Sequence, residues 1–448
     1  MKLQHIKLHN YRNYPDSEFE LGSRLTLLIG KNGMGKTNLI SAMHQSLSFI
    51  FAKGREKPQY NFISSSDCRI RSFSPTDPTF GRNKLGVEDY QYPIEISSKA
   101  TIDENSPFEL SWALSQSASS GGMQTNLYEK ANNIFWDYYL NHIQDLPVLA
   151  YFSDSYPHIT SRIGSKMQKK LNSGKPLPSN TGYYKWDDEH HCTEIWVTYF
   201  VMQMKNAIYQ KDKEKKKYTA NIAKKMIEFS QPLVEGYNEE IRLKDLKLEA
   251  RQKKDVLVFE FEDGRKIPYQ ELPQGYKRLF SIAFDISSRS YILNNNCNPS
   301  GIIFLDELEL HLHPSLAQEV LPRLMKVFPR LQFVATTHSP VVLSNIHNDM
   351  DNIIIYRLVQ DKNKTTKELI TDDYFGLDAN NVLEDAMLSY PMSVGVFKEV
   401  ELINELIKAR ELQKASDAVN DLSKMTSENH PIVIRLNSLI NRLKILGK

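Results

Sequence analysis

Gly30-Lys31-Asn32-Gly33-Met34-Gly35-Lys36-Thr37 decides the fold, because this stretch fits the pattern G-x-x-x-x-G-K-[ST]. The residues before it, Arg24 to Ile29, are mostly apolar and predict a buried strand. The residues after it, Thr37 to Leu47, predict a helix, with apolar side chains at Leu39, Ile40, Met43 and Leu47. A glycine-rich turn between a strand and a helix can point successive backbone N–H groups, and the positive end of the helix, at one anion. The sequence therefore predicts a phosphate-binding loop.

The residue types in this loop predict its chemistry. Lys36 is expected to reach the β- and γ-phosphates of a nucleotide, and the Thr37 hydroxyl is expected to ligate Mg²⁺. The remaining residues that we assign to cofactor binding in this stretch are Gly30, Asn32, Gly33, Gly35 and Asn38. A glycine-rich turn can also be simple punctuation between two elements, but two partner motifs downstream favour a site for ATP or GTP with Mg²⁺.

Those partner motifs lie about 270 residues further along the chain. Ile302 to Glu307 is an apolar strand that ends in two carboxylates, of which Asp306 is expected to hold the metal and Glu307 to polarise the attacking water. A second apolar strand, Leu331 to Thr336, is followed by His338. Because ligands bind at the carboxyl ends of parallel strands, we interpret His338 as a sensor of the γ-phosphate. The alternatives are a structural salt bridge for the carboxylates and an ordinary core or surface role for the histidine.

The chain resembles the ABC-type ATPases, in the soluble branch related to SMC, RecF and OLD proteins. Met1 to Tyr14 is similar to the first strand of that branch and its N-[FY]-R-N-[FY] turn, and Asp306 to Pro314 is similar to its D-E-x-E-x-H-L-H-P stretch. The resemblance implies an α/β fold, a P-loop ATPase head. It also implies ATP hydrolysis between two heads, each completing the other's site, and it assigns Arg12 and Asn13 to nucleotide binding.

The completing element in this branch is a Leu-Ser-Gly-Gly-Gln-like loop followed by a helix. Leu272 to Arg278 is similar to that loop, about 30 residues before Asp306, and we assign Gln274, Gly275 and Tyr276 to cofactor binding. Pro273 stands where a serine commonly contacts the γ-phosphate. Lys277 or Arg278 could supply charge instead. This departure leaves two interpretations open, slow hydrolysis and ATP used as a structural clamp.

A more specific resemblance is to the PtuA-like ATPase subunit of Septu-type antiphage systems and its retron-linked relatives. The residues that carry it are Leu272 to Leu279, Ser290 to Leu293 and Gly376 to Leu383. It implies a bacterial defence complex in which this ATPase holds and regulates an HNH nuclease on another polypeptide. The chain itself has no His-Asn-His pattern, and the stretch after His338 lacks the acidic pattern of a Toprim domain, so we predict no nuclease centre here.

Composition limits the partners and the compartment. The 448 residues carry a formal net charge of +2, which argues against a strongly basic nucleic-acid coat, so any DNA contact must come from a local patch. Three scattered cysteines give no disulfide framework or zinc spacing, which fits a reducing cytoplasm. No long uncharged apolar run predicts a membrane span, and Met1 leads directly into a strand, so we expect neither a membrane contact nor a signal peptide.

We divide the chain into four segments. They are the N-terminal part of the head with a β-rich elaboration, an insertion with a short helical arm, the C-terminal part of the head, and a C-terminal helical extension (1–150, 151–250, 251–370 and 371–448). In the insertion, 155–190 is polar and predicts an exposed loop, although Tyr183, Tyr184 and Trp186 suit either base stacking or packing. His190-His191-Cys192 is not spaced for a metal site.

Three further patterns leave their interpretation open. The lysine-rich run Gln210 to Lys217 fits a solvated helix end or a DNA contact. Two amphipathic helices, Val396 to Leu412 and Ile432 to Ile445, can bury their apolar faces in their own domain or against a partner. The magnesium-binding glutamine that this branch places after the strand Pro147 to Phe152 has no counterpart there.

The function that we predict is an ATPase subunit of an antiphage complex, forming a head-to-head dimer or a higher homo-oligomer. Two rivals stay open. One is a repair or recombination ATPase that clamps DNA, and the other is a scaffold that binds ATP without meaningful turnover.

Overall fold

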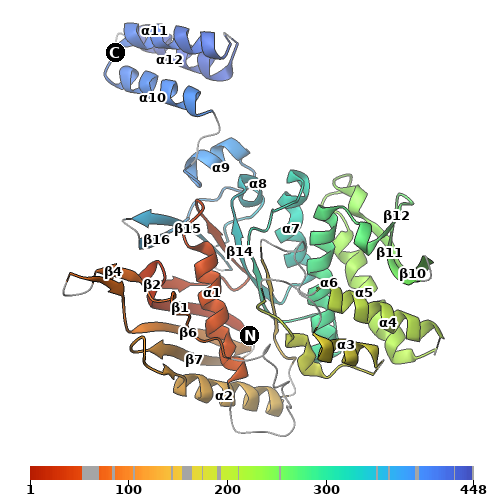
Figure 1. Cartoon of the computed structure of the whole chain (residues 1–448). Helices are drawn as coiled ribbons and strands as arrows, with labels where there is room; N and C mark the ends of the chain where they lie inside the picture. Colours follow the sequence, from red (N-terminus) through yellow and green to blue (C-terminus); the bar gives the residue numbers. More distant parts are fainter. Residues whose placement is uncertain are drawn as a thin grey trace. The chain divides into compact units, whose positions relative to one another are not determined.

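The structure is a computed structural model (Figure 1) that falls into two compact units, Met1–Leu377 and Asp378–Lys448. It describes residues 1–52, 70–82, 86–103, 106–142, 145–153, 164–173, 175–188, 193–209, 211–251, 254–349, 352–361, 364–388, 393–427 and 429–445. His190-His191-Cys192 and the positions directly after Ser153, where the family's glutamine was sought, lie outside these residues.

A six-stranded sheet forms the centre of the first unit. Its strand order is β16-β15-β3-β14-β13-β9. The strands are β3 (Leu25–Ile29), β9 (Val148–Phe152), β13 (Gly301–Leu305), β14 (Leu331–Thr337), β15 (Ile353–Asp361) and β16 (Lys364–Leu369). All neighbours are parallel except β15 and β16. Strands β3, β9, β13 and β14 are buried throughout, as their apolar composition predicts for the interior of a parallel sheet. The predicted α/β head is confirmed.

An antiparallel five-stranded sheet is the predicted β-rich elaboration. It has the order β2-β1-β6-β7-β8. The strands are β1 (Lys2–Tyr11), β2 (Tyr14–Glu20), β6 (Ile94–Asp103), β7 (Ser106–Gln116) and β8 (Met123–Gln124). A separate hairpin is formed by β4 (Phe80–Arg82) and β5 (Glu88–Tyr90).

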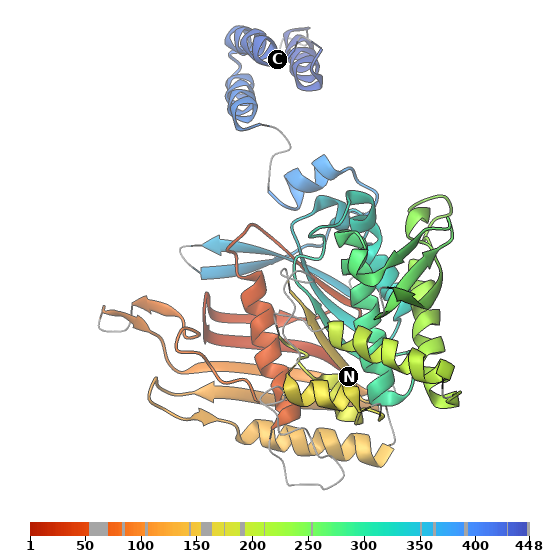
Figure 2. The same ribbon diagram turned by 45° about the vertical axis from the view of Figure 1, so that its right-hand side comes forward.

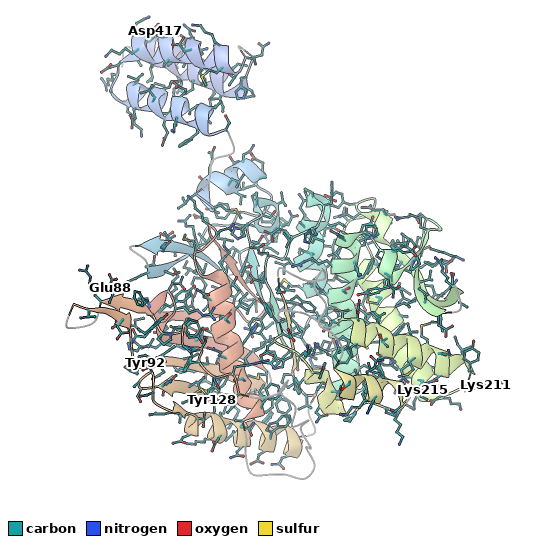
Figure 3. The ribbon with its side chains drawn as sticks, in the orientation of Figure 1. Glu88, Tyr92, Tyr128, Lys211, Lys215 and Asp417 are labelled. Atoms are coloured by element: carbon teal, nitrogen blue, oxygen red, sulfur yellow. The ribbon has the colours of Figure 1, made fainter. Side chains whose placement is uncertain are left out.

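Helix α1 (Lys36–Leu47), which follows the phosphate-binding loop, contacts both sheets (Figure 2). The indole N–H of Trp112, on β7, donates to the Ser46 carbonyl at 2.9 Å. Helix α2 (Asn126–His142) runs beside β7, and its Tyr128 hydroxyl donates to the Gln45 carbonyl (Figure 3). A short 3-10 turn, η1 (Ser48–Phe51), ends this segment. Helix α1 is therefore held in place by contacts with the six-stranded sheet, the five-stranded sheet and α2.

Residues 164–188 correct one prediction. They form α3 (Ser165–Asn172) and the 3-10 turn η2 (Ser179–Tyr183) instead of an exposed loop. Tyr183 and Trp186 are at most 1% exposed, and both rings pack on Phe51. The packing interpretation of these aromatic residues is confirmed, and base stacking is excluded for them. Local polarity was misleading because a few large rings, spaced among polar residues, supply the buried area.

Helices α4 (Thr193–Tyr209) and α5 (Lys213–Ser230) pair with each other and pack on α6 (Gln274–Asn294). Their aromatic side chains face α6, with Phe200 against Phe284 and Tyr218 against Tyr291. Strands β10 (Leu243–Arg251), β11 (Lys254–Phe261) and β12 (Lys266–Pro268) follow as a three-stranded sheet. Strands β11 and β12 form a hairpin whose turn contains the pair Asp263-Gly264.

The lysine-rich run lies at the outer end of the α4–α5 pair, where Figure 3 labels Lys211 and Lys215. Helix α5 begins inside the run, and the Asp212 carboxylate caps it by accepting from the backbone N–H groups of Glu214 and Lys215 at 3.0 and 3.2 Å. Lys216 and Lys217 are exposed. This is the geometry of a solvated helix end.

Two more helices of the first unit follow β13 and β14. Helix α7 (Pro314–Val327) begins after β13, and the short α8 (Pro340–Leu343) begins after β14. Two further 3-10 turns, η3 (Glu239–Ile241) and η4 (Tyr269–Glu271), flank the three-stranded sheet. Across the described ranges, we find no helix with the length and apolarity that a membrane crossing requires.

The second unit is helical. It comprises α9 (Ala379–Asp385), α10 (Val394–Lys408), α11 (Leu412–Met425) and α12 (Pro431–Ile445). The last three share a small core of Val400, Ile403, Ala415, Val419, Leu422, Val433, Leu436 and Ile440. Three apolar side chains within the two predicted amphipathic helices, Leu402, Ile434 and Ile445, are exposed. Helix α11 was missed, and its insertion between the other two decides which side chains are covered.

Candidate nucleotide-binding site

The phosphate-binding loop has the backbone conformation that its glycines predict. Gly30, Gly33 and Gly35 have φ values of 144°, 80° and 89°, which disfavour residues with a Cβ atom. At Gly30 a Cβ atom would also lie 2.6 Å from the Leu358 carbonyl oxygen, and at Gly35 it would lie 2.3 Å from Nδ2 of Asn13. The loop therefore depends on glycine both for its turn and for its close packing on β15 and on the N-terminal turn.

Lys36 is the buried cation of the loop. Its side-chain ammonium donates to the carbonyls of Gly30 and Lys31 at 2.8 and 3.1 Å. Burial lowers the pKa of Lys36 to about 8, and the carboxylates of Asp306, Glu307 and Glu309 oppose this shift. A bound phosphate group would add negative charge beside this buried ammonium and so favour its charged form.

Asp306 meets the loop across the sheet. The Thr37 hydroxyl donates to Oδ2 of Asp306 at 2.8 Å, and the Thr336 hydroxyl donates to Oδ1 at 2.5 Å. The Tyr151 hydroxyl lies 3.5 Å from Oδ2. This oxygen-only group of a hydroxyl and a carboxylate, beside a cationic phosphate site, fits Mg²⁺, which prefers carboxylates, water and phosphate oxygens. The tertiary structure thus brings together the two residues that the sequence assigned to the metal.

Glu307 and His338 face each other at the carboxyl ends of β13 and β14. Nε2 of His338 lies 3.8 Å from Oε1 of Glu307. Glu307 has φ of 45°, and its backbone N–H donates to the Thr336 hydroxyl at 2.8 Å. Burial lowers the pKa of His338, and the nearby Lys36 ammonium acts in the same direction. A mainly neutral imidazole beside a half-buried carboxylate suits the predicted pair of sensor and water-polarising base.

Glu309 is a site residue that sequence reasoning missed. Its carboxylate accepts from the Thr337 hydroxyl at 2.8 Å and from the backbone N–H of His338 at 2.6 Å. These bonds fix the turn that presents the His338 ring. The signal was present in the second glutamate of the D-E-x-E stretch, but its role depends on the turn that follows another strand, β14.

We expect Glu309→Gln to lower the turnover number for ATP about tenfold, because an amide oxygen cannot accept both bonds as a carboxylate does, and losing one charge-assisted bond is worth about 1.5 kcal/mol. The affinity for ATP should stay within about threefold, since no phosphate ligand is removed. Steady-state ATPase kinetics check this, with Glu271→Gln, at an exposed glutamate, as the control. Equal turnover in both variants would contradict the assignment.

The N-terminal turn supports the loop from outside. Nη1 of Arg12 donates to Oδ1 of Asn38 at 2.7 Å, and Nε donates to Asp77 at 2.9 Å. The Asn13 amide accepts from Nδ2 of Asn38 at 2.8 Å and donates to the Thr365 hydroxyl. Thr365 in turn donates to the Met34 carbonyl at 3.1 Å. Arg12 and Asn13 thus lie beside the start of α1, and their direct contact with nucleotide stays a prediction.

Gln274, Gly275 and Tyr276 form the first turn of α6, directly after the N-cap residue Pro273. The helix begins earlier than we predicted, since we placed a loop up to Arg278. Arg278 also corrects the suggestion that it supplies charge to a phosphate. It is 1% exposed, and its guanidinium donates to backbone carbonyls of the same head. Lys277 is less buried and remains available for that role.

The structure therefore gathers residues from three distant segments. Gly30, Asn32, Gly33, Gly35, Lys36, Thr37 and Asn38 form the loop and the first turn of α1, and Asp306, Glu307 and His338 lie at adjacent strand ends. A family model described as an AAA ATPase domain matches residues 1–343. The chain belongs to this AAA ATPase family. The family resemblance that we predicted from the sequence is confirmed, and membership of this ATPase family implies nucleotide binding.

Among named relatives of this AAA ATPase, the probable ATPase of retron Vc95 from Vibrio cholerae serotype O1 biovar El Tor is 23% identical over 394 residues, covering 79% of this chain and 73% of the relative. The Septu protein PtuA of Bacillus mycoides is 30% identical over 118 residues, covering 24% and 17%. The DNA replication and repair protein RecF of Clostridioides difficile is 30% identical over 102 residues, covering 21% and 28%. The chain thus matches most of the Vibrio relative and only short parts of the other two.

Solved structures give a weaker likeness. The SMC head domain from Thermotoga maritima aligns with a TM-score of 0.41 at 12% identity, covering 83% of this chain and all of that chain.

Proposed function

We propose that this AAA ATPase binds ATP with Mg²⁺ and hydrolyses it slowly, as a subunit of an antiphage defence complex. The observation that carries the nucleotide part is the group formed by Lys36, Thr37, Asp306, Glu307 and His338, because it unites a phosphate cradle, a metal ligand and a base. The defence part is supported by the likeness to a retron ATPase over 79% of the chain and to a Septu protein over a shorter part.

We assign each residue of this group a separate role in ATP hydrolysis. Lys36 would pair with phosphate oxygens, and Thr37 and Asp306 would hold Mg²⁺, which neutralises charge on the phosphates. Glu307 would orient and polarise the attacking water, and His338 would contact the γ-phosphate oxygens. The first turn of α6, with Gln274 and Gly275, would complete the site of a second copy. Because Pro273 offers no hydroxyl or N–H, we expect slow turnover.

For the complex, we propose that two or more copies associate through these sites and hold a partner HNH nuclease. The nucleotide state of the ATPase would then regulate the nuclease. Support for a separate nuclease is that the sequence contains neither a His-Asn-His pattern nor the acidic pattern of a Toprim domain after His338. A preparation of the nuclease without this ATPase that cleaves nucleic acid at full rate would contradict the regulatory part.

The test is phage plaquing on cells that carry this gene with its native neighbours, wild type against Lys36→Ala. We expect at least about tenfold fewer plaques with wild type and no protection with the variant, because the variant cannot hold phosphate. Protection by both would show that the phosphate site is dispensable. No protection by either, across a broad phage panel, would contradict the defence assignment.

A repair ATPase that clamps DNA remains the second candidate, because RecF proteins are among the relatives. It predicts DNA binding that ATP strengthens and that salt weakens steeply. Filter binding at several salt concentrations, with and without ATP, separates it from the defence function. Glu307→Gln separates a scaffold with little turnover from both of these functions. A true hydrolytic cycle predicts loss of activity in this variant, whereas a scaffold predicts little change.

A further inference from the structure

Arg278 is a buried cation outside the nucleotide-contacting set, and it joins the first turn of α6 to the catalytic strand ends. It lies four residues after Gln274 and is 1% exposed. Its Nη2 donates to the carbonyls of Asp306 and Glu307, both at 3.0 Å, and Nη1 donates to the Ser153 carbonyl at 3.3 Å. One guanidinium therefore ties α6 to the residues that follow β13 and β9.

The segment that Arg278 holds is conformationally strained. Glu307 and His311, at its two ends, have φ values of 45° and 66°, a region that side-chain-bearing residues rarely adopt. The Glu307 conformation is fixed from both sides, by Thr336 at its N–H and by Arg278 at its carbonyl. Without the guanidinium, the backbone of Glu307 would lose one of the two hydrogen bonds that hold this conformation.

A second contact joins the same two segments. Gly275 packs so closely on the segment that a Cβ atom there would lie 2.9 Å from the His311 carbonyl oxygen. The first turn of α6 thus touches one end of the strained segment through Gly275 and holds the other end through Arg278. Gly275 is packed against this segment and Arg278 is hydrogen-bonded to it. A displacement of the start of α6 would therefore also move the Glu307 backbone.

We infer that Arg278 is a positioning residue that sets the Glu307 carboxylate and couples it to the first turn of α6. This rests on the proposed function, in which that turn engages the nucleotide of a second copy. Nucleotide seated in one site would then adjust the base of the other. Sequence reasoning had considered this arginine, as an alternative to Lys277, only as a source of charge for a phosphate.

Arg289 provides a matched control on the same helix. It is fully buried, and its guanidinium pairs with Asp285 and donates to the carbonyls of Gly182 and Tyr184 at 2.8 and 3.0 Å. It also lies over the Trp196 ring. Arg289→Lys therefore disturbs a buried arginine with carbonyl acceptors, but its contacts are with η2 and α4 and not with Asp306 or Glu307.

The test compares Arg278→Lys with Arg289→Lys in the full chain, using two measurements. Steady-state ATPase kinetics with Mg²⁺ and ATP should show a turnover number lowered at least about tenfold in Arg278→Lys, with ATP affinity within about threefold of wild type. Hydrogen exchange without nucleotide should be at least about tenfold faster in peptides spanning Leu305 to Leu312. In Arg289→Lys, turnover per folded molecule and exchange in those peptides should match wild type.

The two measurements separate the inference from the proposed function. If wild type hydrolyses no ATP, the proposed hydrolysis fails, and hydrogen exchange still decides the role of Arg278. Unchanged exchange in Arg278→Lys, or equal effects of the two substitutions on both measurements, would overturn the inference. If Arg278→Lys does not fold, Gly275→Ala replaces it, because the added methyl group presses on His311 while the guanidinium stays. The same two readouts then decide.

Discussion

Lys36→Ala is expected to weaken ATP binding at least about a hundredfold, which corresponds to about 3 kcal/mol. Lys36 is 6% exposed, and its ammonium is already oriented by the carbonyls of Gly30 and Lys31. Its contact with phosphate would be a desolvated, charge-assisted one, which is worth far more than a surface ion pair. Fluorescence titration with a labelled ATP analogue and Mg²⁺ measures the effect.

Lys31→Ala is the matched control for Lys36→Ala. Lys31 belongs to the same loop and is exposed. The Lys31 carbonyl that accepts from the Lys36 ammonium is part of the backbone, so the substitution leaves it in place. We expect its ATP affinity to remain within about threefold of wild type, since an exposed charge is screened by solvent and salt. Equal weakening by both substitutions would mean that overall loop charge, rather than the Lys36 contact, binds the phosphates.

Glu307→Gln is expected to lower the turnover number at least about a hundredfold, the usual contribution of a positioned general base. The amide has nearly the same shape but cannot take up a proton, so the affinity for ATP should be retained. We also expect ATP to stabilise the associated form of this variant, because bound nucleotide is no longer consumed. Single-turnover kinetics measure the chemical step, and light scattering with ATP measures the association.

Glu262→Gln, at an exposed glutamate of the turn between β11 and β12, controls for the loss of one carboxylate. Its turnover should equal that of wild type. If Glu307→Gln also hydrolyses ATP at the wild-type rate, then either another group polarises the water or the protein is a scaffold whose slow background rate needs no base. Either outcome would remove Glu307 from the catalytic assignment.

The arrangement of the candidate site was largely predictable because each of its motifs is local. A few adjacent residues predict each structure. They are the glycines of the loop, the apolar strand before Asp306 and the strand before His338. Parallel strands place such motifs at one edge, so their meeting could be expected, and the contact of Thr37 with Asp306 realises it.

Other parts depended on partners far away in the sequence. The segment 164–188 looked polar and exposed, yet Tyr183 and Trp186 are buried against Phe51. Arg278 was considered, as an alternative to Lys277, as a source of charge for a phosphate, although its guanidinium donates to the carbonyls of Ser153, Asp306 and Glu307. Sequence spacing gives no information about which acceptor a long side chain will find once the strands are assembled.

The sequence by itself determined the class of chemistry and the class of fold. Backbone conformations that require glycine, and strands buried on both faces, leave a direct mark on residue type. Only the tertiary structure decided how Glu307, the proposed base, is held. The left-handed conformation of Glu307 exists because Thr336 and Arg278, from β14 and α6, bind its N–H and its carbonyl. Such hydrogen bonds join atoms that become neighbours only when the sheet has formed, so no local pattern records them.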